Sequence, residues 1–370
     1  MASLRLNQLE SIERLRAAAD AWDDLWRRSE TTIPTVRAEL VALWLETYAP
    51  TSPFCALVVE QDGRMVGALP LVEKKIGRMI RGGGLTANYW SPNGNLLLDP
   101  DTDVERAAAL LADGMESLDW PLFWFDMVPN AMTGWKALLC ELSHRGLSVD
   151  VHHRWDVGRI ALDDDVEAYF AARSKNLRRS LRKDAHRLEE QGPLEFCFEE
   201  HFSYGLVEKR LDEIFTVEDR SWKGDAGSSV MQNSTALEFY RQQARRLAEW
   251  DLLRVARLRH AGRTIAFDLG WIGSGTYHSY KIGYDPEYGS FGPGHLLRER
   301  QIRELVAKGD IQAIDFQGPM TRALRSWATD SYPIARVVVA QRRLSSRALF
   351  ASYHAAARAV RLARKFPRPW

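Results

Sequence analysis

The stretch that decides the fold is 277-YHSYKIGYDPEYGSFGPGHLL-297. Its pattern predicts a strand that ends at Tyr284 and a helix that begins near His295. The loop between them contains Gly289, Gly292 and Gly294. Glycines let a backbone approach a ligand closely, and the free N–H groups at a helix start attract anions. The stretch therefore predicts a phosphate site, and a plain glycine turn before a helix is the alternative interpretation.

The residues around this stretch alternate between helix and strand periodicity. Upstream, we expect strands at 156–161, 194–199, 252–259, 264–273 and 276–284, and helices at 166–172, 176–190, 206–220 and 235–249. Downstream, we expect a helix at 295–308, strands at 311–316 and 332–341, and a last helix at 346–365. A β-meander followed by β-α-β is typical of an α+β sheet flanked by helices.

The first half of the chain repeats this order with different residues. We expect helices at 8–28, 35–48, 101–118 and 131–144, the third capped by Asp101 or Thr102, and strands at 54–60, 65–73, 95–98, 122–127 and 147–152. The glycines of 81–84 are read as a loop. The shared order indicates two tandem domains, residues 1–153 and 154–345, with a crossover at 151–156. Residues 346–370 form a basic helix and tail.

Length and charge agree with two domains and an anionic ligand. The chain has 370 residues, too many for one ordinary core. Residues 1–150 carry 14 Lys and Arg against 21 Asp and Glu, whereas residues 151–370 carry 36 against 28. A basic half suits a phosphorylated cofactor, a nucleic acid or an anionic surface. Uneven solvated charge is the alternative explanation.

Several classes of site and location are disfavoured. Cys55, Cys140 and Cys197 lie far apart, which predicts neither a disulfide framework nor structural zinc. The neighbours His152 and His153 face opposite sides of a strand, so we expect no metal. No signal peptide or membrane-spanning run is apparent, and we expect a cytoplasmic protein. The basic C-terminal helix is expected to pack on the second domain, with weak contact to anionic lipid as the alternative.

The residues that could carry chemistry gather in the second half. Glu218 lies in a cluster of charges at a helix end, and it is the favoured carboxylate for accepting a proton. Asp268, His278 and Tyr280 lie on adjacent strands, with His278 and Tyr280 expected on one face and Lys281 on the other. Each could equally be a satisfied polar group of the core. The remaining candidates, expected to bind substrate, are Arg178, Arg182, Trp222 and Lys281.

Three segments carry a resemblance to a known family. They are 174-SKNLRRSLRKDAHRL-188, 217-VEDRSWKG-224 and the stretch from Tyr280 to Leu297, followed by Asp315-Phe316 and Trp327. Together they resemble the GNAT-fold acyltransferases of the BioF2-like/CelD group, relatives of the FemAB peptidyltransferases. The resemblance implies two tandem GNAT-like domains and an acyl-CoA co-substrate, acetyl-CoA above all.

The same resemblance implies roles for particular residues. The donor's pantetheine arm would run beside Tyr277–Tyr284, and Asp315 would belong to the substrate site. The diphosphate would bind at Ser290, Gly292, Gly294, His295 and Leu296. The acceptor would be a small molecule or glycan precursor of polysaccharide or cell-envelope synthesis, bound in a cleft between the domains.

Two other functions stay open. One is FemAB-like transfer of an amino acid from aminoacyl-tRNA, although no zinc finger or helix-turn-helix pattern indicates nucleic-acid binding. The other is a catalytically silent binding protein that keeps the fold. The family often has a Tyr-Lys pair shortly before the tryptophan that matches Trp327, and this chain has Ala323-Leu324 there.

Overall fold

The computed structural model describes residues 3–76 and 80–365, without the side chains of Tyr204, Trp222, Lys223 and residues 356–365. These residues form two compact units. Unit 1 contains Thr35–Arg154, the segment up to Thr31 and the segment from Pro333 onwards. Unit 2 contains Trp155–Tyr332 together with Thr32–Pro34.

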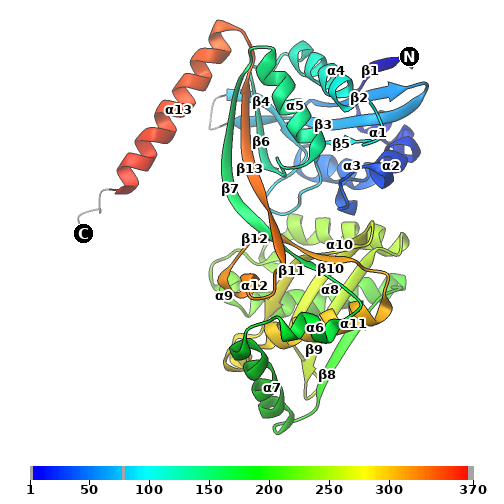
Figure 1. Cartoon of the computed structure of the whole chain (residues 1–370), viewed down its shortest axis with the longest axis vertical. Helices are drawn as coiled ribbons and strands as arrows, with labels where there is room; N and C mark the ends of the chain where they lie inside the picture. The colour runs from blue at the N-terminus through cyan, green and yellow to red at the C-terminus, as the bar shows by residue number, and fades with distance from the viewer. Residues whose placement is uncertain (1–2, 77–79, 366–370) are drawn as a thin grey trace. The chain divides into compact units, whose positions relative to one another are not determined.

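Unit 1 is a mixed sheet with helices on both faces (Figure 1). Its strands follow the order β1-β2-β3-β4-β6-β13, with β5 on β3. The strands are β1 (Leu4–Leu9), β2 (Phe54–Gln61), β3 (Arg64–Ile76), β4 (Ile80–Leu85), β5 (Leu97–Leu98), β6 (Leu122–Val128) and β13 (Asp330–Ala340). The helices are α1 (Ile12–Ala17), α2 (Ala19–Arg28), the 3-10 turn η1 (Pro34–Val36), α3 (Ala38–Tyr48), α4 (Val104–Ser117), α5 (Thr133–His144) and α13 (Leu344–Lys365).

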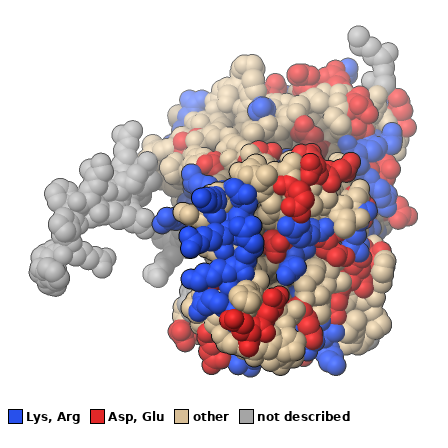
Figure 2. Space-filling model, turned by 60° about the horizontal axis from the view of Figure 1, so that its bottom comes forward, with Lys and Arg blue, Asp and Glu red and all other residues tan. Residues whose placement is uncertain are grey.

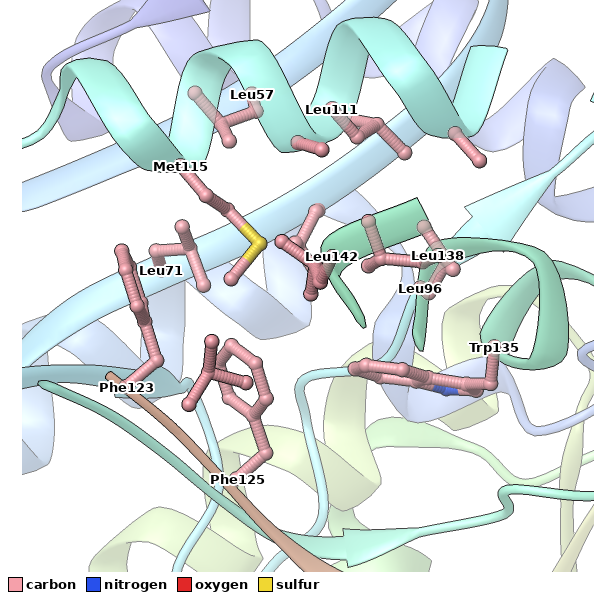
Figure 3. Packing of buried hydrophobic residues seen from close by; sticks show 14 of the residues in the cluster. Leu57, Leu71, Leu96, Leu111, Met115, Phe123, Phe125, Trp135, Leu138 and Leu142 are labelled. Atoms are coloured by element: carbon pink, nitrogen blue, oxygen red, sulfur yellow. The ribbon is translucent and has the colours of Figure 1, made fainter. Parts of the chain in front are cut away.

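The core of unit 1 lies between this sheet and helices α4 and α5. Figure 3 shows Leu111 and Met115 of α4 and Leu138 and Leu142 of α5 packed over Phe123 and Phe125 of β6. These side chains are fully buried. Alternate residues of each strand face this layer because strand side chains alternate between faces, and the other face receives α1–α3.

Three features of unit 1 differ from the sequence prediction. The helix expected at 8–28 begins only at Ile12 and is divided into α1 and α2, because residues 4–9 form strand β1. Asp103 caps α4, through its side chain and the Arg106 N–H, instead of Asp101 or Thr102. The glycines of 81–84 lie in strand β4 and form no loop. A Cβ atom at Gly82 would stand 2.6 Å from the Leu122 carbonyl oxygen, so the glycines let β4 lie against β6.

Strand β13 brings the end of the chain back to unit 1. It pairs antiparallel with β6, from Ala335 opposite Val128 to Ala340 opposite Leu122. Residues 333–345, which the sequence analysis placed in the second domain, therefore lie with unit 1. Helix α13 follows, and Tyr353 packs edge-on against Trp124 of β6, with ring centroids 5.1 Å apart.

Unit 2 contains strands in the order β7-β12-β11-β10-β9-β8, with β7 entering it at Trp155. The strands are β7 (Ser148–Ala161), β8 (Leu194–Glu199), β9 (Leu253–His260), β10 (Arg263–Gly273), β11 (Thr276–Tyr284) and β12 (Ala313–Pro319). The helices are α6 (Val166–Ala171), α7 (Lys175–Glu189), α8 (Tyr204–Asp219), α9 (Trp222–Asp225), α10 (Ser234–Glu249), α11 (Pro293–Lys308) and α12 (Arg322–Arg325), with 3-10 turns η2 (Val230–Gln232) and η3 (Pro286–Phe291). The two strands expected at 147–152 and 156–161 are one strand, β7.

The two faces of this sheet carry different helices. Helices α6, α7 and α11 share one core with the sheet, through Phe170, Leu181 and Leu297 among others. Helices α8 and α10 pack on the opposite face, where they contact β9, β10 and β11. The predicted α+β architecture of two tandem domains flanked by helices is confirmed, although the strands belong to one large mixed sheet where separate sheets were expected.

Candidate donor site in unit 2

The site begins where β11 and β12 separate. These neighbours are parallel, and their register has three pairs, from Thr276 opposite Ala313 to His278 opposite Asp315. Strand β11 nevertheless runs on to Tyr284. On this extension Ile282 and Tyr284 are 43% and 47% exposed, although both are large and apolar. The edge of β11 beyond His278 is thus available to an extended ligand in the way that an edge strand is.

A β-bulge lies at the start of this open edge. The pairing of β11 with β10 passes from Ser279 opposite Gly270 to Lys281 opposite Leu269, so Tyr280 is the extra residue. A bulge shifts the alternation of side chains by one residue. The expectation that Lys281 faces away from Tyr280 is therefore wrong, because both side chains contact the α8 and α10 layer.

Beside the bulge, aromatic and charged groups from two helices converge. The Tyr280 hydroxyl lies 3.1 Å from the Tyr240 hydroxyl of α10, and the Tyr280 ring packs on Trp271 with centroids 4.3 Å apart. The Lys281 ammonium donates to the Glu218 carboxylate of α8 at 2.9 Å. Glu218 is fully buried and also accepts from the Val230 N–H at 3.1 Å. The structure thus brings together three predicted residues, Glu218, Tyr280 and Lys281.

The glycine loop leads directly into α11. Asp285 starts η3 with its side chain accepting from the Glu287 N–H, and Gly292 ends it in the left-handed region at φ 56°. Pro293 is the first residue of α11. A Cβ atom added at Gly294 would have no neighbouring atom within 4 Å, and Gly294 and Ser290 are both exposed. The start of this four-turn helix is therefore open to an anion.

The next two residues of α11 point the other way. Leu296 is buried in the core of unit 2. The His295 ring accepts a hydrogen bond from the Trp327 indole N–H at 3.0 Å, and burial lowers the pKa of His295. Of the predicted diphosphate residues, Ser290, Gly292 and Gly294 line the open side, whereas the side chains of His295 and Leu296 hold α11 in place.

Asp268 belongs to a buried network that ties α11 to the sheet. The Arg298 guanidinium of α11 lies 2.8 Å from its carboxylate, and the hydroxyls of Tyr277 and Ser279 donate to it at 3.1 and 2.7 Å. Asp268 is 1% exposed and Arg298 5% exposed. Burial and the neighbouring Asp268 raise the pKa of Tyr277 well above its ordinary value. Both oxygens of Asp268 are thus engaged in fixing α11 on β10 and β11.

His278 and Asp315 lie side by side where β11 and β12 still pair. The Gln317 amide donates to both, at 2.9 Å to His278 Nδ1 and 2.8 Å to Asp315. The Tyr332 hydroxyl donates to the other Asp315 oxygen at 2.9 Å. Burial raises the pKa of Asp315 and lowers the pKa of His278 to about 3. Gln317 adopts φ 55°, which turns its amide back onto this pair.

The buried His278 predicts a pH-dependent stability. Its pKa lies below the value of about 6.5 for an unfolded histidine, so only the unfolded chain gains this proton as the pH falls below 6.5. At pH 5 the loss is about 2 kcal/mol relative to pH 7. We expect His278→Gln to remove about this much of the difference in unfolding free energy between pH 7 and pH 5, measured by urea titration.

The exposed His186 provides the control for this measurement. Its side chain is 72% exposed, so His186→Gln should leave the pH dependence unchanged. Identical pH dependence in the wild type and in His278→Gln would contradict the assignment of His278 as a buried neutral histidine.

The other predicted substrate residues are dispersed. Arg182 is exposed on α7, whereas Arg178 is half-buried and lies on the same side of the helix as the buried Leu181, three residues further on. The side chain of Trp222 lies outside the described residues. Ala323 and Leu324 form part of α12, where Leu324 packs against the core of unit 2. Trp327, just after α12, is 2% exposed.

Several residues of the site escaped sequence analysis. Arg298, Tyr240 and Gln317 were not singled out, although Arg298 directly follows the 277–297 stretch and Gln317 directly follows Asp315-Phe316. Among the described residues no group of three His, Cys, Asp or Glu side chains is arranged to hold a metal ion. None of the helices in the described part of the chain is long and apolar enough to cross a membrane.

Comparison with known proteins agrees with this geometry. Residues 175–332 match the family model described as acetyltransferase (GNAT) domain. This range contains the open edge of β11, the glycine loop and α11. A search of the curated proteins gives no match.

Solved structures show the fold over most of the chain. One is the C-terminal domain of a putative lysylphosphatidylglycerol synthetase from Agrobacterium fabrum, with 13% identity, a TM-score of 0.53 and coverage of 90% of this chain and 94% of that chain. Another is a conserved protein of unknown function from Bacteroides thetaiotaomicron, with 13% identity, a TM-score of 0.53 and coverage of 92% and 100%. A tandem GNAT protein from the clavulanic acid pathway has 13% identity, a TM-score of 0.48 and coverage of 90% and 98%. Residues 175–332 thus form a GNAT acetyltransferase domain, which makes the protein an acyltransferase.

Proposed function

We propose that the protein is an acyl-CoA-dependent N- or O-acyltransferase, with acetyl-CoA as the donor bound in unit 2. The observation that carries this proposal is the separation of β11 from β12 after three residue pairs, next to a glycine loop and an open helix start. An extended thioester with a diphosphate at its far end fits such a surface. The diphosphate binds at Ser290, Gly292 and Gly294, and the pantetheine arm follows β11.

The chemistry requires two proton transfers. An acceptor amine or hydroxyl loses a proton as it attacks the thioester carbon, and the departing CoA thiolate gains one. The bulge places Tyr280 at the start of the open edge, where the pantetheine arm would end. We assign the Tyr280 phenol as the acid that protonates the thiolate, with Glu218 and Lys281 as the charged pair nearest to it.

Asp268 and His278 suit catalysis less well. Both oxygens of Asp268 accept bonds from buried groups, including the Arg298 guanidinium. His278 is 1% exposed. A general base becomes protonated when it accepts the proton of the acceptor, and the low pKa of His278 disfavours this protonated form. We therefore assign both as positioning residues, Asp268 for α11 and His278 for the junction of β11 and β12.

The acceptor is proposed from the resemblance to the BioF2-like/CelD group. That resemblance favours an amine or hydroxyl on a small molecule or glycan precursor of polysaccharide or cell-envelope synthesis. Asp315 and the neighbouring Tyr332 are engaged with each other through a 2.9 Å hydrogen bond. We therefore propose that Asp315 supports the base of the site through this hydrogen bond. Transfer from aminoacyl-tRNA is the alternative. It predicts that the chain uses charged tRNA, and not acetyl-CoA, as the donor.

Replacing Tyr280 with phenylalanine tests the chemical assignment. We expect the rate of CoA release to fall about 10²- to 10⁴-fold, because removal of a general acid costs this much. The affinity for acetyl-CoA should change little, since the ring and its packing on Trp271 remain. The measurement is thiol release from acetyl-CoA, followed with a disulfide reagent, in the presence of a panel of amino sugars and polyols.

Tyr89→Phe serves as the matched control because Tyr89 is 85% exposed and lies in unit 1. It should release CoA at the wild-type rate. A Tyr280→Phe protein that keeps the wild-type rate would remove Tyr280 from the mechanism. If the wild type releases no thiol with any acceptor but accepts an aminoacyl group from charged tRNA, the alternative donor is favoured.

A further inference from the structure

Helix α7 carries a row of cations at every fourth position. They are Lys175, Arg179, Lys183 and Arg187, and we call this row the basic ridge. Residues four apart lie above one another on one side of a helix. The buried residues of α7, Leu181 and Leu188, lie on another side. Lys175, Arg179 and Lys183 are exposed, and Figure 2 shows a continuous band of Lys and Arg on one face of the molecule.

The basic ridge is unfavourable for the helix itself. Like charges at this spacing destabilise a helix by about 0.2–0.5 kcal/mol per pair. Other helices of this chain use the same spacing for opposite charges, as in Glu299–Arg303 of α11 at 2.7 Å. Within the described residues Lys175, Arg179 and Lys183 make no ion pair, and Arg187 pairs only with Asp184, at 3.3 Å. The chain does not neutralise the ridge, which leaves its charge available to an anion.

One end of the basic ridge lies at the glycine loop. The Arg187 guanidinium stacks over the Phe291 ring of η3, 4.5 Å from its centroid. Asp184 is close enough to His295 to influence its pKa. Phe291 directly precedes Gly292, so the ridge ends beside the open start of α11. From there it extends for about 18 Å, because twelve residues of helix rise 1.5 Å each.

A CoA donor has a second anionic group close to its diphosphate. It is the 3′-phosphate on the adenosine ribose, which carries close to two negative charges at neutral pH. With the diphosphate at Gly292 and Gly294, the nearest unpaired cation of the ridge is Lys183, followed by Arg179 one turn further. A phosphate monoester prefers such a pair of cations with several N–H donors.

We propose that the basic ridge of α7 binds the 3′-phosphate of the donor, so that the site selects CoA over dephospho-CoA. This inference rests on the proposed acyl-CoA function. Lys183 and Arg179 contact the phosphate, and Arg187 keeps α7 against η3 by stacking on Phe291. Lys175, at the far end of the ridge, attracts the anionic donor through its positive charge.

The test compares CoA with dephospho-CoA by isothermal titration calorimetry. We expect the wild type to bind CoA about 10- to 100-fold more tightly, because charge-assisted hydrogen bonds contribute about 1.5–3 kcal/mol. In the double variant Arg179→Gln, Lys183→Gln the preference should fall below about threefold, with the affinity for dephospho-CoA unchanged. Lys209→Gln, an exposed lysine of α8, is the control and should keep the full preference.

The outcomes separate the two proposals. Equal affinity of the wild type for CoA and dephospho-CoA overturns the role of the basic ridge and leaves the donor site intact. Binding of neither compound overturns the proposed function and the inference with it. If the double variant keeps its CoA preference but loses binding to bulk tRNA or to vesicles with anionic lipid, the ridge serves that macromolecule and the inference is overturned.

Discussion

Asp268→Ala is expected to lower the free energy of unfolding of unit 2 by about 3–5 kcal/mol, because it leaves a buried guanidinium without its partner. Arg298 is 5% exposed, and Asp268 is the carboxylate beside it, at 2.8 Å. The Tyr277 and Ser279 hydroxyls lose their acceptor in the same change. Urea titration monitored by tryptophan fluorescence measures the effect.

The surface pair of Asp212 and Arg241 provides the comparison. These groups lie 2.8 Å apart, but their side chains are 52% and 31% exposed. Asp212→Ala should cost less than about 1 kcal/mol because solvent screens exposed ion pairs. If Asp268→Ala keeps wild-type stability and loses only the release of CoA, then Asp268 is a catalytic residue and its assignment as a positioning residue is wrong.

Gly294→Trp is expected to weaken acetyl-CoA binding at least about 100-fold, equivalent to about 2.7 kcal/mol. The indole would occupy the space in front of the first turn of α11, where the diphosphate should accept backbone N–H bonds. The fold should survive, because Gly294 is exposed and a Cβ atom added there has no neighbouring atom within 4 Å. The loss therefore reports on the donor and not on folding.

A tryptophan at Gly205 is the matched control for size and hydrophobicity. Gly205 also has nothing within 4 Å of an added Cβ atom, and it lies in the first turn of α8, at the opposite end from Glu218. Gly205→Trp should bind acetyl-CoA with wild-type affinity. Circular dichroism and thermal unfolding of both variants establish that each remains folded.

Periodicity predicted most of the elements, and its failures have physical causes. The meander of β9–β11 and helices α7, α10 and α11 lie where their apolar patterns place them. Strand β4 was missed because glycine disfavours strands in isolation, whereas here Gly82 is needed for close contact with β6. Strand β13 was expected in the second domain but pairs with β6, because this antiparallel pairing joins residues more than 200 positions apart in the sequence.

The site could be located from the sequence, but its contacts could not be derived. The glycine loop and the helix start after it follow from local signals, and the loop does precede α11. The bulge at Tyr280 reverses the face expected for Lys281, because one extra residue shifts a period of two. The burial that lowers the pKa of His278 and the Arg298 partner of Asp268 depend on tertiary packing, which no local pattern encodes.

The most direct test of the donor site is a calorimetric titration of acetyl-CoA into the wild type and Gly294→Trp proteins. We expect saturable binding of one acetyl-CoA per chain to the wild type, and loss of that binding in a Gly294→Trp protein that remains folded. Equal affinity in the two proteins would contradict the placement of the diphosphate at Gly292 and Gly294. Absence of acetyl-CoA binding to the wild type would contradict the acyl-CoA-dependent function itself.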